Sequence, residues 1–95
     1  MVNAVVLIQC EIDSIPEAAE AIAEIDGVTE VYSVAGEFDL VAIVRVHDHD
    51  SLASVIPQGI ARVEGVERTE TLIAFQVYSK HDLDRLFSIG FEERG

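Results

Sequence analysis

The chain has few basic residues. Six Lys and Arg stand against 18 Asp and Glu, which gives a formal net charge of −12 at pH 7. Proteins that bind nucleic acid neutralise phosphates with Lys and Arg, and anionic membrane surfaces attract basic segments. The charge balance therefore predicts a protein that makes no direct contact with DNA or RNA and does not bind a membrane.

Cysteine and long apolar runs are also scarce. Cys10 is the single cysteine among 95 residues, so no disulfide can form within the chain, which favours a reducing compartment and predicts a cytoplasmic protein. Its apolar neighbours predict that Cys10 is a small core residue. No apolar run approaches the roughly 18 residues of a membrane span, and no basic segment of a signal peptide occurs near Met1.

Motifs of common catalytic sites are missing. The sequence has no phosphate-binding glycine loop, no CxxC and no GxSxG. The run His47-Asp-His-Asp50 places two histidines at strand spacing, but a metal site needs further convergent ligands. We therefore expect this run to be a strand end leading into an N-capped helix, and we predict no catalytic residue, no metal and no cofactor.

Strand and helix patterns alternate regularly along the chain. Ser14 and Glu17 have the spacing of a capping box, Gly27 is expected at the end of the first helix, and Pro57 should interrupt the second. The order of elements predicts a ferredoxin-like βαββαβ domain of α+β class, an antiparallel sheet with two helices on one face. The predicted strands are 4–12, 28–34, 39–47 and 66–79, and the predicted helices are 15–25, about 51–63 and a short final one at 82–89.

The predicted sheet is apolar on both faces. The third strand carries Leu40, Ala42 and Val44 on one side and Val41 and Ile43 on the other. Two helices cover one face, so the other needs a second cover, and a second copy of the chain is the simplest one. We therefore expect a homodimer with sheets packed face to face. The alternative is a monomer whose C-terminal tail folds over that face.

Two short segments carry candidate ligand groups. Gly36 permits a positive φ and exposes backbone N–H groups that suit a carboxylate, while Asp39 suits an ammonium group, and together they match a free α-amino acid. Thr69 and Thr71 share one face of the last strand and offer hydroxyls. The alternatives are a plain hairpin turn at residues 36–39 and threonines chosen for strand propensity.

Two longer runs resemble the effector domain of the Lrp/AsnC family, also called the RAM domain. They are Gly27-Val-Thr-Glu-Val-Tyr-Ser-Val-Ala-Gly-Glu-Phe-Asp39 and Gly65-Val-Glu-Arg-Thr-Glu-Thr-Leu-Ile73. The resemblance implies dimers that pair through their sheets in a dimeric α/β-barrel-type assembly, rings of dimers, and amino-acid effectors bound between dimers. It implies ligand contacts at Gly36, Phe38 and Asp39, followed by Thr69 and Thr71.

The chain departs from the family pattern at its start. Typical members carry an N-terminal helix-turn-helix that binds DNA, whereas Met1 is followed almost at once by the first strand. We therefore expect residues 1–95 to form a single effector-binding domain without a DNA-binding domain, acting through a homo-oligomer or through a full-length relative.

Two other functions compete with an effector-binding domain. One is a pure assembly protein without a ligand. The other is a cofactor-free enzyme of the dimeric α/β-barrel type, which would need pocket residues that this chain lacks: it has no Trp, and Asn3 is its only Asn.

Overall fold

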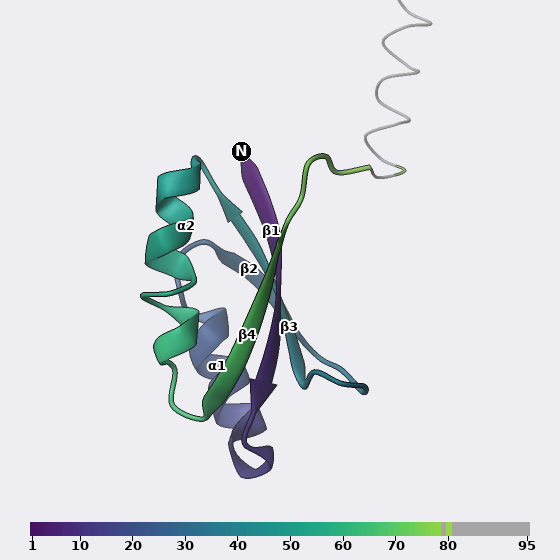
Figure 1. Cartoon of the computed structure of the whole chain (residues 1–95), viewed down its shortest axis with the longest axis vertical. Helices are drawn as coiled ribbons and strands as arrows, with labels where there is room; N and C mark the ends of the chain where they lie inside the picture. Colours follow the sequence, from purple (N-terminus) through teal and green to yellow (C-terminus); the bar gives the residue numbers. More distant parts are fainter. Residues whose placement is uncertain (79, 81–95) are drawn as a thin grey trace, which may run out of the picture.

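A computed structural model describes residues 1–78 and 80 of the chain (Figure 1). The strands form one antiparallel sheet of order β2-β3-β1-β4, and both helices cover the same face of it. This is the βαββαβ arrangement that the sequence predicts, while the predicted final helix at 82–89 lies outside the described residues. The elements are β1 (Val2–Cys10), η1 (Ile12–Ser14), α1 (Ile15–Ala23), β2 (Val28–Ser33), β3 (Leu40–Val46), α2 (His49–Val55), η2 (Ile60–Arg62) and β4 (Val66–Ile73).

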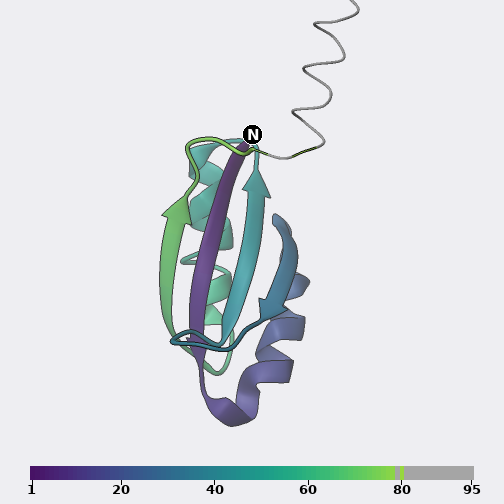
Figure 2. The same cartoon turned by 90° about the vertical axis from the view of Figure 1, so that its right-hand side faces the viewer.

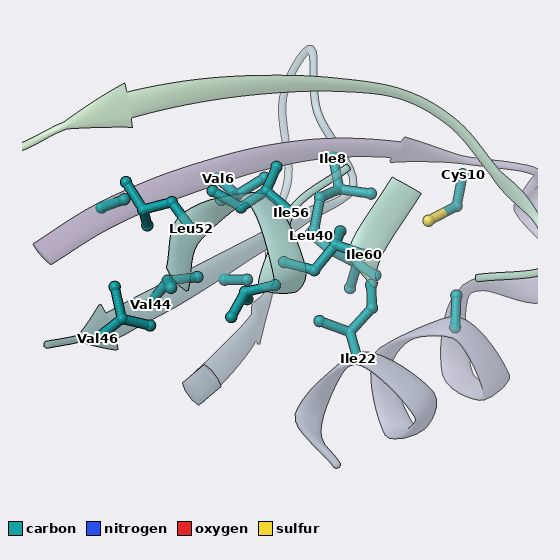
Figure 3. Packing of buried hydrophobic residues seen from close by; sticks show 14 residues of the cluster. Val6, Ile8, Cys10, Ile22, Leu40, Val44, Val46, Leu52, Ile56 and Ile60 are labelled. Carbon is teal, nitrogen blue, oxygen red and sulfur yellow. The ribbon is translucent and has the colours of Figure 1, made fainter. Parts of the chain in front are cut away.

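The core lies between the sheet and the two helices (Figure 3). Successive side chains of a strand point to opposite faces, so every second residue of β1 and β3 enters this layer. Opposite them, Ile22 of α1 and Ile60 of η2 are fully buried. The fourteen buried core residues are Ala4, Val6, Ile8, Cys10, Ala18, Ile22, Leu40, Ala42, Val44, Val46, Leu52, Val55, Ile56 and Ile60.

The helix ends agree with the sequence in part. The Asp48 carboxylate accepts hydrogen bonds from the backbone N–H and the hydroxyl of Ser51, both at 2.8 Å, and these bonds lower the pKa of Asp48. The helix α2 ends at Val55, two residues before Pro57, as predicted. The capping box at Ser14 is wrong, because its side chain makes no capping hydrogen bond to α1. The turn η1 precedes this helix directly, so Ser14 already has a backbone conformation outside the extended region.

Three predicted boundaries are also wrong. The strand β1 ends at Cys10, because η1 begins at Ile12, whose side chain is therefore 82% exposed instead of buried. The helix α1 is capped at Glu24, so Gly27 lies in the following turn. The strand β4 ends at Ile73 instead of continuing to residue 79. Its last backbone hydrogen bond to β1 runs from the Ala74 N–H to the Asn3 carbonyl at 2.8 Å, and the chain then leaves the sheet.

No helix in the described part of the chain combines the length and the apolar character that a membrane span requires.

Glycine at position 65 is required by both conformation and space. Gly65 has a φ of +93°, and a Cβ atom there would lie 2.5 Å from the Ser14 Cβ. Gly36 also has a positive φ, +144°, but a Cβ atom there would meet nothing within 4 Å. A side chain at either position would strain the backbone, but only at position 65 would it also clash with a neighbour.

We expect Gly65→Ala to lower the free energy of unfolding by about 1–3 kcal/mol more than Gly36→Ala does. Both substitutions place alanine at a positive φ, at a cost of about 1–2 kcal/mol, but only the first forces a clash. Urea unfolding of the two variants and the wild type measures the difference. Equal losses in the free energy of unfolding would contradict this prediction. They would mean that the turn after η2 shifts to accommodate the new Cβ atom without a measurable cost from Ser14.

Candidate functional site

One face of the sheet is not covered by the helices, and we call it the open face. The register places Val5 opposite Ile43 and Leu72, and Leu7 opposite Val41, on this side. These five side chains form an apolar centre, of which Leu72 is 52% exposed. This confirms that the sheet is apolar on both faces. Charged side chains surround this centre, two of each sign, and they are Glu30, Arg45, Arg68 and Glu70.

The loop between β2 and β3, residues 34–39, is fastened to the end of β1. The backbone N–H of Asp39 donates to the Ile8 carbonyl at 2.9 Å, and the side-chain amide of Gln9 donates to the Glu37 carbonyl at 2.9 Å. The loop projects from the sheet on the side away from the helices and crosses the end of β1 toward β4 (Figures 1 and 2). It therefore forms a wall at one end of the open face.

A cation–π contact joins this loop to β4. The guanidinium carbon of Arg68 lies 5.4 Å from the centre of the Phe38 ring. Such a contact at an exposed position contributes about 0.5–1 kcal/mol. Arg68 is opposite Gln9 in the sheet, so the three side chains Gln9, Phe38 and Arg68 connect the loop to both neighbouring strands.

The Asp39 carboxylate has one engaged and one available oxygen. Its Oδ2 accepts a hydrogen bond from the backbone N–H of Cys10 at 2.9 Å. Within residues 1–78 and 80, no hydrogen bond engages Oδ1, and no buried side-chain oxygen or nitrogen lacks a partner, so Oδ1 reaches solvent. Asp39 therefore fastens the loop with one oxygen and leaves the other accessible to solvent.

The structure does not bring all five predicted site residues to one face. Gly36 is exposed in the loop, with open space around its α-carbon, and Phe38 and Asp39 belong to the same loop. Thr69 and Thr71 lie opposite Ile8 and Val6, and therefore point to the helix side of β4. One ligand can touch both groups only if the threonines come from another chain.

Sequence reasoning missed Gln9, Glu37 and Arg68. Gln9 marks the point where β1 turns from apolar to polar, which was visible in the sequence. Its contact with Glu37 spans 28 residues, and the pairing with Arg68 depends on strand register, so neither partner could be identified.

The Cys10 thiol lies beside the point where Asp39 attaches the loop to β1. The pKa of the Cys10 thiol is raised above its ordinary 9.0, first because the group is buried and then because Asp39 and Glu67 are close. Cys10 is thus a neutral core thiol, as predicted.

We expect Asp39→Ala to lower the free energy of unfolding by about 1–3 kcal/mol, because it leaves the part-buried N–H of Cys10 without an acceptor. In Asp39→Asn the amide oxygen still accepts this bond, so its stability should stay near the wild type. Urea unfolding of both variants tests the assignment. A large loss in Asp39→Asn would mean that the charge, not the hydrogen bond, fastens the loop.

Alkaline pH should weaken the fold partly through Cys10. Because folding raises the pKa of this thiol, its contribution to stability is complete below the unfolded pKa and is lost as pH rises through the folded pKa. The free energy of unfolding should therefore fall more steeply above about pH 8.5 in the wild type than in Cys10→Ala.

Urea unfolding of the two proteins over this pH range measures the difference. The pKa of Tyr32 is also raised, by its hydrogen bond to Glu30, but this residue is common to both proteins and cancels. Parallel pH profiles would contradict the prediction.

Comparison with known proteins places this geometry in a family. The model of the Lrp/AsnC ligand binding domain matches residues 3–83. The Thermus thermophilus protein TTHA0845 is 51% identical, with a TM-score of 0.79 over 84% of this chain and 100% of that one. An HTH-type transcriptional regulator of Pyrococcus horikoshii is 39% identical over 59 residues, which are 62% of this chain and 39% of that regulator. The chain thus spans well under two thirds of the curated regulators it matches.

A more distant solved structure has the same fold. The Neisseria meningitidis transcriptional regulator in complex with L-Met is 12% identical, with a TM-score of 0.73 over 82% of this chain and 52% of that one. The match over residues 3–83 covers the whole βαββαβ unit, including the 34–39 loop and β4. The chain belongs to the Lrp/AsnC ligand-binding-domain family.

Proposed function

We propose that this domain binds a free amino acid or a similar small effector and acts as an oligomeric regulatory module without catalysis. The observation that carries the proposal is the Asp39 carboxylate, which is fixed by the Cys10 N–H and has a second oxygen open to solvent. The family membership supports a ligand-binding role, and the related curated proteins are transcriptional regulators.

The loop chemistry matches an α-amino acid. An ammonium group would contact Asp39 Oδ1, and a carboxylate would bind the exposed backbone around Gly36, which has room for close approach. The Phe38 ring would contribute an apolar surface. A regulator of the same fold is solved in complex with L-Met, which supports an amino acid as the ligand class here.

A second chain would complete the site. Thr69 and Thr71 lie on the other side of the sheet from the loop, so their hydroxyls would reach the effector only from a neighbouring copy. We propose that two copies pair through their open faces as a homodimer, and that dimers then meet near the 34–39 loops. The apolar centre of Val5, Leu7, Val41, Ile43 and Leu72 supports this pairing.

Regulation would reach DNA indirectly. At a net charge of −12 the chain would be repelled by phosphates, so we propose no direct DNA contact. A full-length Lrp/AsnC relative that assembles with this domain would supply that contact, and a cytoplasmic location follows from such a partner.

A thermal-shift screen against free amino acids tests the proposal. A ligand present at about 100 times its Kd adds about 2.7 kcal/mol to the free energy of unfolding. We expect a selective rise in melting temperature for the wild type and none for Asp39→Asn. This variant keeps the hydrogen bond from the Cys10 N–H and loses only the charge. An unchanged melting temperature with every amino acid, in a folded oligomer, would refute effector binding and favour a pure assembly protein.

A further inference from the structure

Arg68 is a cation without an acidic partner. Glu67 and Glu70 are close to it in β4, yet within residues 1–78 and 80 no carboxylate oxygen comes within 4.0 Å of its guanidinium group. Its contact is instead with the Phe38 ring, whose centre lies 5.4 Å from the guanidinium carbon. In a chain with 18 acidic and six basic residues, an arginine that pairs with none of the acids near it keeps its charge available for a ligand.

The contact with Phe38 holds the guanidinium group without using its hydrogen-bond donors. An aromatic ring attracts a cation through its face. The five N–H donors of a guanidinium group lie in one plane and fit both oxygens of a carboxylate. In the part of the chain that the structure describes, no oxygen accepts a hydrogen bond from Arg68. The ring thus orders the side chain in advance, which lowers the cost of binding an anionic group there.

A group of opposite charge is attached to the same end of β1. The Asp39 carboxylate accepts the hydrogen bond of the Cys10 N–H, and Arg68 is opposite Gln9 in the sheet, so consecutive residues of β1 hold the two charges. Asp39 and Arg68 nevertheless form no ion pair with each other. Opposite charges that are fixed on neighbouring positions and remain unpaired are complementary to a zwitterion, whose ammonium and carboxylate groups can bridge them.

We propose that Arg68 binds the carboxylate of the effector while Asp39 binds its ammonium group, so that the site selects molecules that carry both charges. This inference rests on the proposed function and adds the residue that determines its specificity. Backbone N–H groups around Gly36 can reach a carboxylate, but such neutral donors also bind the oxygen of a carboxamide. Among the residues of the proposed site, only Arg68 brings a positive charge, and a charged donor distinguishes the two groups.

The charge of the chain favours a zwitterion over a multiply charged anion. A phosphate group would meet one arginine here, with the Asp39 carboxylate attached beside it and a net charge of −12 on the chain. Repulsion by these negative charges opposes its approach. A zwitterion has no net charge and turns its ammonium group toward Asp39, so the same negative charges favour one of its ends. The ligand class is therefore a free amino acid with an unmodified carboxylate.

Pairs of amino acids and their carboxamides test the role of Arg68. The twenty amino acids and the matching carboxamides are screened by thermal shift, and Kd values are measured by calorimetry, at about pH 6.5, where the ammonium group of both ligands stays protonated. We expect at least one amino acid to bind the wild type at least about ten times more tightly than its carboxamide. In Arg68→Gln this preference should disappear, because the amino acid binds as weakly as the carboxamide, whose own Kd stays near the wild-type value.

Arg62→Gln is the matched control. Arg62 is exposed in η2, in the helix layer, so this substitution removes the same charge from another part of the molecule and should keep the preference. If Arg68 only held the loop through Phe38, Arg68→Gln would weaken amino acid and carboxamide equally. That result, or a wild type that binds both ligands equally well, would overturn the role of Arg68 and leave the proposed function intact. A wild type that binds neither kind of ligand would overturn both.

The oligomeric state separates a ligand contact from an interface contact. Sedimentation of wild type and Arg68→Gln is compared by analytical ultracentrifugation on the samples used for the Kd measurements. A variant that dissociates into monomers but keeps the preference for an amino acid over its carboxamide would assign Arg68 to an interface between copies and overturn the proposal. Loss of the preference in a variant that sediments like the wild type is the result we expect.

Discussion

The central strands β1 and β3 are apolar on both faces, while the helices cover only one. On the covered side, alternate residues such as Val6 and Val44 are buried against the helices. On the other side, Val5 and Ile43 remain without a cover within the described residues. The two segments that leave the sheet lie on this side as well, because the 34–39 loop and residues 74–78 after β4 both project away from the helices (Figure 1).

One carboxylate fixes the 34–39 loop at this face and is also the proposed ligand contact. Asp39 closes the loop onto β1 with Oδ2, and the same rigid attachment directs Oδ1 toward solvent. A ligand that binds Oδ1 would meet a group already held in place, so little ordering is required on binding. The contact between Phe38 and Arg68 also lowers the ordering that binding would require, because it attaches the loop to β4.

The sequence predicts what depends on local pattern and misses what depends on distant partners. Alternation identified the buried face of β1 and β3, and Pro57 located the end of α2. The end of β4 at Ile73 is not visible in the sequence, because residues 74–78 continue the strand-like pattern beyond it. Likewise Asp39 was recognised as a ligand candidate, but its bond to Cys10 joins residues 29 apart and follows only from the strand register.

The distribution of charge decides which molecules can reach each surface. A formal net charge of −12 disfavours the approach of polyanions and of other copies of the chain over most of the surface. The open face is the exception, because its centre is apolar and its surrounding charges cancel. The proposed self-association there would also bring together Glu30, Arg45, Arg68 and Glu70 of each copy, which allows complementary pairing under a two-fold axis. In the proposed homodimer the acidic charge would therefore favour this face over the more acidic remainder of the surface.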